Sequence, residues 1–113
     1  MPHAIIECSE NMLESVRAAR ACEMAYKILN ESGLFTPDAI KTRLYSPVES
    51  YVGQEGHAGR FIHITVYLMQ GRTVEQRKAL ATQLAQTFGK SFPSTHSLTV
   101  DVRELEKAVY TKK

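Results

Sequence analysis

The alternating segment at residues 60–69 restricts how this chain can fold more than any other feature. One of its faces is wholly aliphatic, which is typical of a strand that packs beneath helices. That face comprises Ile62, Ile64, Val66 and Leu68. The opposite face is too apolar for open solvent, since it carries Phe61, His63, Thr65, Tyr67 and Met69. We therefore expect this face to pack against other subunits of an oligomer, although scattered surface aromatics are also normal in monomers.

The rest of the chain shows a strand-helix-strand pattern on each side of a long loop at residues 46–59. In the first half, residues 2–8 and 40–45 form the expected strands. Between them, Asn11 is the expected N-cap of a helix, with Glu14 completing an approximate capping box and Gly33 ending the helix. The apolar stripe that predicts this helix is Met12, Val16, Ala19, Cys22, Tyr26 and Leu29.

The second half repeats this plan with strands at residues 60–69 and 98–105. Thr73 and Gln76 form a capping box at the start of the second helix, which is expected to end near Gly89. Its apolar positions are Leu80, Leu84 and Phe88.

The two halves predict an α/β (α+β) fold with a duplicated βαβ unit. We expect one domain over residues 1–113, with pseudo-repeats at about 2–52 and 60–105. Two helices suffice to cover one face of a four-stranded mixed sheet. The same βαββαβ order also fits ferredoxin-like domains, including small-molecule sensors.

Composition excludes several classes of protein. The formal net charge of +2 is too small for a general nucleic-acid binder. No apolar run reaches the roughly 18 residues of a membrane span, and the N-terminus lacks the pattern of a signal peptide. Cys8 and Cys22 have no disulfide-framework spacing, which favours reduced thiols. We expect a cytoplasmic protein with no nucleic-acid or membrane partner.

Pro2 opens the first strand directly after Met1. Removal of Met1 would leave a terminal secondary amine, with a reference pKa of about 7.7–8.0. Desolvation and nearby cations would lower that pKa toward neutrality and create a general base. The alternative is that Pro2 only begins an edge strand, where a missing N–H costs little.

Two segments carry a resemblance to a known family. The segment GRTVEQR at residues 71–77 is similar to the Gly-Arg turn of the 4-oxalocrotonate tautomerases. The opening PHAIIECSEN at residues 2–11 resembles more closely the 5-carboxymethyl-2-hydroxymuconate isomerase family of the tautomerase superfamily. SGLF at residues 32–35 and IKTR at residues 40–43 continue the similarity.

The resemblance implies a tautomerase fold, a homotrimer and a site near each subunit interface. It implies that Pro2 is the catalytic base and that Arg72 and Arg43 bind a substrate carboxylate. Lys41 is a further candidate for substrate binding. It stands where the isomerase that this chain resembles carries another arginine, and a lysine keeps the charge but lacks the bidentate fork. The implied reaction is ketonisation of an unsaturated 2-hydroxy polycarboxylate in aromatic-acid breakdown, with no metal or organic cofactor. The first half has Asn11 in place of a Gly-Arg turn, so one site per subunit is expected.

Other interpretations of these residues stay open. Arg72 could be a solvated charge beside a helix cap, and Lys41, Arg43 and Tyr45 could form an ordinary exposed strand face. The chain could also be a superfamily member with another substrate, a non-catalytic interaction protein with this fold, or a ferredoxin-like binding module. The pairing of the strands distinguishes the ferredoxin-like module from the others. In the tautomerase plan the two strands of each half pair in parallel, whereas the ferredoxin-like sheet is antiparallel.

Overall fold

The fold is built on one four-stranded sheet, and the computed structural model describes residues 1–113. Its strands are β1 (His3–Cys8), β2 (Lys41–Tyr45), β3 (Phe61–Met69) and β4 (Ser97–Leu105), in the order β2-β1-β3-β4. The β1–β2 and β3–β4 pairs are parallel, whereas β1 and β3 are antiparallel. Each half of the chain therefore pairs its own strands in parallel. This confirms the predicted mixed sheet and excludes the ferredoxin-like plan.

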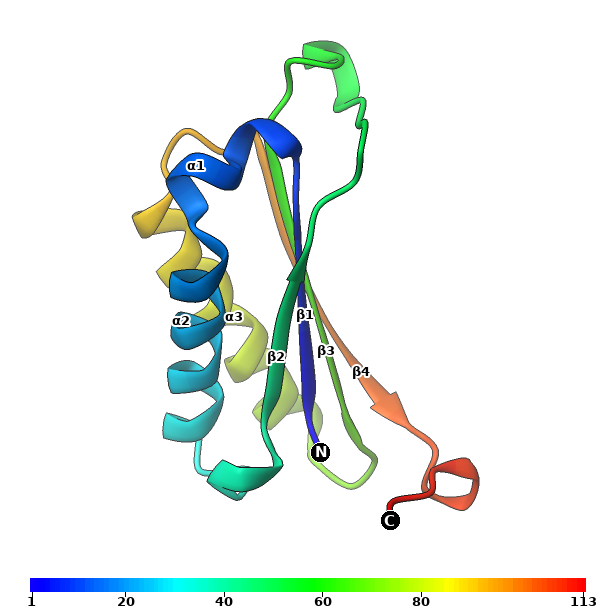
Figure 1. The fold of residues 1–113 in the computed structure, drawn as a ribbon. Coiled ribbons are helices and arrows are strands. Elements are labelled where there is room, and N and C mark those ends of the chain that lie inside the picture. Colours follow the sequence, from blue (N-terminus) through cyan, green and yellow to red (C-terminus); the bar gives the residue numbers. More distant parts are fainter.

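The helices cover one face of this sheet (Figure 1). They are α1 (Leu13–Val16), α2 (Ala18–Glu31) and α3 (Val74–Ser91). Short 3-10 turns precede or follow the strands: η1 (Glu10–Met12), η2 (Pro37–Ala39), η3 (Gly53–Glu55) and η4 (Lys107–Val109). None of the helices is both long and apolar enough to cross a membrane.

The helix of the second half of the chain, α3, begins as the sequence predicts. The Thr73 hydroxyl accepts a hydrogen bond from the Gln76 backbone N–H (3.1 Å), and the Gln76 side chain accepts one from the Thr73 backbone N–H (2.9 Å). These two bonds are the reciprocal contacts of a capping box, which satisfy otherwise unpaired N–H groups at a helix start. The helix ends at Ser91, slightly beyond the expected Gly89.

The first helix differs from the prediction, because the chain breaks it at Arg17. Arg17 has a positive φ of 57° and separates α1 from α2. The break changes the helical phase, so that Ala21 and Ala25 are buried while Ala19 of the predicted stripe is exposed. Gly33 follows α2 with a φ of 74°, as expected of a glycine at a helix end.

The prediction that Asn11 caps the first helix is wrong. Asn11 lies within η1, and its amide group donates to the carbonyl oxygens of Ala58 and Gly59 (3.1 and 3.4 Å). The side chain therefore holds the end of the loop at residues 46–59 and is not available to the helix N–H groups. Sequence spacing cannot distinguish these two uses of an asparagine, because the loop contact is distant in the chain.

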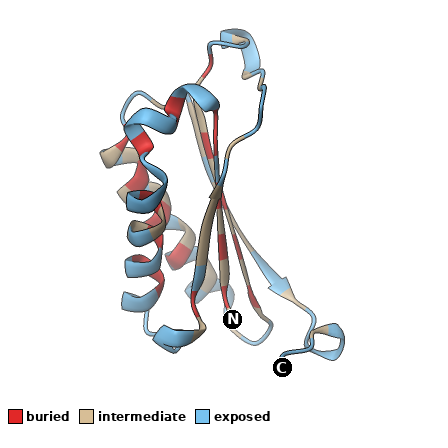
Figure 2. Cartoon of the chain, viewed as in Figure 1, coloured by how far each residue is buried: buried red, intermediate tan, exposed pale blue.

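The core lies between the sheet and the helices (Figure 2). All of the aliphatic positions on one face of β3 are fully buried there: Ile62, Ile64, Val66 and Leu68. Each such side chain contributes about 1.5–3 kcal/mol when removed from water. The opposite face of β3 has only intermediate exposure in one copy of the chain, and no helix covers it. The helices therefore leave a half-apolar sheet face unpartnered.

Candidate active site

Three segments of the chain meet at one edge of the sheet. β1 and β2 are parallel and both begin at this edge, whereas β3 is antiparallel to β1 and ends there. The register places His3 between Lys41 of β2 and Tyr67 of β3. The turn that carries Arg72 and both chain termini lie at the same end of the molecule (Figure 1). The sheet topology thus brings the N-terminus together with residues distant in the sequence.

Pro2 is fixed in place at this edge. Its side chain is fully buried, and its carbonyl oxygen accepts a hydrogen bond from the Lys41 backbone N–H (3.1 Å). A proline has no N–H to donate, so its nitrogen takes no part in the strand ladder. The nitrogen of Pro2 is therefore held at the edge of the sheet, one peptide bond from Met1.

The amino group of Met1 reports the electrostatics of this edge. Partial burial lowers the pKa of this amine, and the positive charges of Lys41, Lys112 and Arg72 lower it further. Both causes favour a neutral amine, because burial penalises the charged form and like charges repel it. Lys41 and Arg72, two residues selected from the sequence, thus lie in the surroundings of the amino terminus.

Arg72 is a constrained side chain, not a freely solvated charge. Its guanidinium donates to the carbonyl oxygen of Leu34 through Nη2 (2.6 Å) and to that of Met69 through Nη1 (3.4 Å). The same group lies over the ring of Phe35, 5.1 Å from its centroid, in a cation–π contact. These contacts fix the guanidinium and leave part of its five-donor fork free for an anion.

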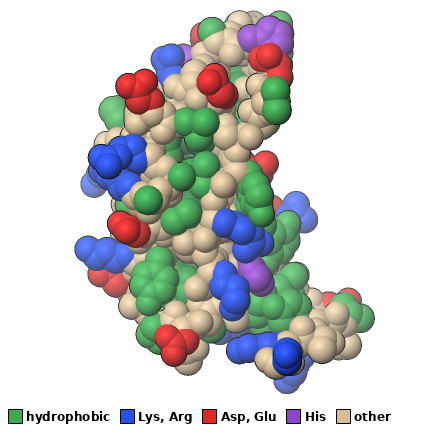
Figure 3. All heavy atoms as spheres, viewed as in Figure 1, with side chains coloured by type: hydrophobic (Ala, Val, Ile, Leu, Met, Phe, Trp, Pro, Cys, Tyr) green, Lys and Arg blue, Asp and Glu red, His purple; other side chains and the backbone are tan.

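Lys41 and Arg43 lie on the sheet face that carries no helix. The Lys41 ammonium donates to the carbonyl oxygen of Ala39 (3.2 Å) and is exposed. Arg43 Nη1 lies 3.0 Å from His3 Nδ1. In Figure 3, Lys and Arg side chains gather over this end of the molecule. None of the ion pairs of the structure involves Lys41, Arg43 or Arg72, so their charges remain available to a ligand.

Two neighbours of this cluster were not selected from the sequence. His3 contacts Arg43, and the hydroxyl of Tyr110 contacts Met1 Sδ and lies 3.5 Å from His3 Nε2. Partial burial lowers the pKa of His3, as do the charges of Arg43 and Lys41. The period of the first strand puts His3 on the open face, but no sequence signal indicates that the tail returns to the N-terminus.

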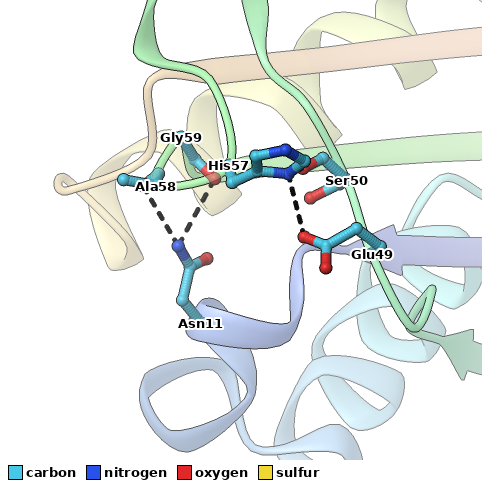
Figure 4. Close-up of polar contacts among 6 residues, drawn as sticks. All are labelled: Asn11, Glu49, Ser50, His57, Ala58 and Gly59. Carbon is cyan, nitrogen blue, oxygen red and sulfur yellow. Dashed lines mark hydrogen bonds and ion pairs between the residues drawn. The ribbon is translucent and has the colours of Figure 1, made fainter.

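A second polar cluster lies at the opposite end of the sheet (Figure 4). There His57 Nδ1 lies 3.0 Å from a carboxylate oxygen of Glu49, and Asn11 donates to Ala58 and Gly59. The pocket beside these residues has a volume of only about 120 Å³. No group of three or more His, Cys, Asp or Glu side chains is placed to hold a metal ion. These contacts hold the long loop against the start of the first helix.

A larger groove of about 440 Å³ lies between α2 and α3, on the helix side of the molecule. Its walls include Ile28, Leu34, Leu80 and Gln76. It contains none of the cations selected from the sequence. The strand edge, not this groove, therefore offers the combination of an amine and several positive charges.

Comparison with known proteins gives one family match and many structural ones. The family model described as 5-carboxymethyl-2-hydroxymuconate isomerase matches residues 2–113. No curated protein sequence matches the chain. A crystal structure of a 5-carboxymethyl-2-hydroxymuconate isomerase from Deinococcus radiodurans R1 superposes with a TM-score of 0.88 at 21% identity, over 99% of this chain and 88% of that one.

Two further structures have the same fold. A 5-carboxymethyl-2-hydroxymuconate delta-isomerase gives a TM-score of 0.79 at 16% identity, over 100% of this chain and 87% of the other. A fused 4-OT protein, described as a symmetric trimer, gives a TM-score of 0.77 at 16% identity, over 97% of this chain and 90% of the other. At these identities the likeness shows the fold, and the predicted tautomerase fold is thereby confirmed.

The lowered pKa of His3 predicts a pH-dependent stability. Folded His3 binds a proton less readily than unfolded His3, so its contribution to stability is present above the ordinary pKa of about 6.5 and is lost as the pH falls through the lower folded value. An NMR titration should give a pKa below about 6.5 for His3, and the free energy of unfolding should fall more steeply with acid in wild type than in His3→Gln.

Matched arginine variants test the electrostatic contribution to this shift, which adds to that of burial. Arg43→Ala removes a neighbouring positive charge and should raise the pKa of His3. Arg103→Ala removes an arginine that is paired with Asp101 (2.6 Å) and should leave it unchanged. A His3 pKa at or above the ordinary value in wild type would contradict the electrostatic description of this edge.

Proposed function

Because the chain belongs to the 5-carboxymethyl-2-hydroxymuconate isomerase family, we propose that it is an isomerase that ketonises an unsaturated 2-hydroxy polycarboxylate from aromatic-acid breakdown. We propose further that Pro2 is the base and that no cofactor takes part. The observation that carries this proposal is the environment of the amino terminus, where partial burial and the charges of Lys41, Lys112 and Arg72 lower the pKa of the Met1 amine. Consecutive Cα atoms are about 3.8 Å apart, so an amine freed at Pro2 would keep much of this environment.

The reaction needs one group that can accept a proton and return it. In a 2-hydroxy dienoic acid, the neutral Pro2 amine takes the proton of the 2-hydroxyl group, and the electron pair moves through the conjugated carbons as the carbonyl forms. The protonated amine then delivers the same proton to a distant carbon of the chain. An amine with a pKa near the working pH can perform both steps.

The cations would hold the substrate and stabilise its charge. An arginine can bind a carboxylate through two parallel hydrogen bonds, which fixes the carbon skeleton against the base. Arg72 is itself held by Leu34 and Met69, so its fork is oriented before a ligand arrives. Arg43 and Lys41 supply further positive charge on the open face. Several cations in one place favour a substrate with more than one carboxylate.

Blocking the amine of Pro2 is the direct test of the proposed base. We expect a protein that starts at Pro2 to ketonise a 2-hydroxymuconate-type dienol at least about a hundredfold faster than one with an uncleavable extension, because general acid–base catalysis contributes about 10²–10⁴-fold. The loss of dienol absorbance measures the rate, and intact mass verifies each N-terminus. Equal rates in the two proteins would rule out Pro2 as the base.

Loss of Arg72 should impair binding of carboxylate substrates. Hydrogen bonds to charged groups are worth about 1.5–3 kcal/mol, so Arg72→Ala should lower kcat/KM by about tenfold to a hundredfold, chiefly through KM. Arg72→Lys keeps the positive charge but lacks the bidentate fork, so its kcat/KM should lie between those of wild type and Arg72→Ala. Lys78→Ala, which removes an exposed cation of α3, is the control. Steady-state constants for Arg72→Ala equal to those of wild type would remove Arg72 from the proposed site.

We also propose a homotrimer that buries the part of the open sheet face that β3 forms. This face carries Phe61, Thr65, Tyr67 and Met69 and is uncovered in one copy of the chain. The fused 4-OT neighbour with this fold is described as a symmetric trimer. An apolar sheet face of this kind is suited to contact between identical subunits.

Light scattering on a sizing column should give three times the chain mass of 12.7 kDa. Thr65→Arg places a charge at the middle of the open face and should shift the mass toward that of one chain, because an unpaired buried charge is costly. Thr82→Arg makes the same change on the exposed side of α3 and should leave the mass unchanged. A wild-type mass of one chain would refute the proposed trimer.

A further inference from the structure

The C-terminal tail is anchored where it passes the N-terminus. The backbone N–H of Lys107 donates to the side-chain oxygen of Gln70 (2.8 Å), and the Gln70 N–H donates to the carbonyl oxygen of Leu105 (3.2 Å). These contacts tie the start of η4 to the end of β3. Tyr110 follows η4 directly and is partly buried. The hydrogen bonds that hold the tail to the end of β3 therefore also place Tyr110 beside Met1 and His3.

The contact with Arg43 fixes the tautomer of His3. A guanidinium can only donate hydrogen bonds, so His3 Nδ1, 3.0 Å from Arg43 Nη1, must be the acceptor. A neutral imidazole that accepts at Nδ1 carries its proton at Nε2. The charged groups around the ring, Arg43 and Lys41 of β2 and the amino terminus, all lower the pKa of His3 and favour this neutral form. Tyr67 pairs with His3 in register on β3, and its phenol is not among the groups that shift the pKa of His3.

The same tautomer sets the direction of the Tyr110 hydroxyl. His3 Nε2–H faces the oxygen of Tyr110 at 3.5 Å, so that oxygen is the acceptor of this contact. The hydroxyl proton of Tyr110 is then free to point elsewhere, and it is directed to Met1 Sδ. Removal of Met1 takes this acceptor away. The hydroxyl would then present an unpaired donor beside His3, at the N-terminal end of the chain.

We propose that Tyr110 is a further catalytic residue, whose hydroxyl donates a hydrogen bond to the substrate oxygen that becomes negative when Pro2 removes its proton. His3 is the positioning residue that orients this hydroxyl, and Arg43 orients His3. The inference rests on the proposed function, because it needs the same substrate and the same base. No bond to Tyr110 is made or broken: the proton passes from the 2-hydroxyl to Pro2 and then to carbon. Arg43 donates one of its five N–H groups to His3, and others remain for a carboxylate.

Removing the hydroxyl of Tyr110 tests its role. Tyr110→Phe keeps the ring and should lower kcat by about tenfold or more while KM changes by less than about twofold, since a donor aimed at developing charge acts mainly in the transition state. Tyr26→Phe on α2 has no hydrogen bond to lose and is the matched control. An active wild type with an unchanged kcat in Tyr110→Phe would overturn the role of Tyr110 alone. An inactive wild type that starts at Pro2 would overturn the proposed function as well.

The role of His3 is tested through a second, independent signal. Nitrogen-15 NMR of the wild-type ring should show the proton at Nε2, and Arg43→Ala should weaken that preference. His3→Leu should lower kcat about as much as Tyr110→Phe, and the double variant should lose no more than either single one, because residues that act through one contact are not additive. A proton at Nδ1, or fully additive losses, would refute the chain of contacts from Arg43 to Tyr110.

Discussion

The pairing of β1 with both of its neighbours is the constraint on which the rest of the structure depends. β1 pairs in parallel with β2 and antiparallel with β3, so the starts of two strands and the end of a third share one edge. This arrangement puts the N-terminus beside Lys41 and close to the turn that bears Arg72. A shift of one residue in the β1–β2 register would turn Lys41 and Arg43 toward the helices. The strand pairing that builds the sheet thus also determines which positive charges surround the amino terminus.

The positively charged side chains at this edge are held in place by contacts with neutral groups. Arg72 rests on two carbonyl oxygens and on the ring of Phe35, and Arg43 rests on a neutral His3. Carbonyl oxygens and rings fix a guanidinium without cancelling its charge, whereas a carboxylate partner would cancel it. The edge therefore keeps a net positive field for anions. Partial burial lowers the pKa of His3 and of the amino terminus, and the same positive field lowers both further.

Local patterns in the sequence predicted the elements that depend only on near neighbours. The alternation at residues 60–69 and the Thr73–Gln76 capping box are both present in the structure. Asn11 shows where this reasoning fails, since its side chain binds the backbone of a loop 47 residues away. Arg17 shows the same limit in the backbone, because nothing in its neighbours' apolar spacing indicates a positive φ.

The sequence by itself determined the duplicated βαβ plan, the family resemblance and the selection of Pro2, Lys41, Arg43 and Arg72 as site candidates. Period and capping are local properties, so they can be recognised without coordinates. Only the tertiary structure decided that His3 and Tyr110 join this cluster. Their contacts join the two ends of the chain, and they depend on strand order and on the path of the tail after β4. Such long-range contacts leave no periodic signal in the sequence.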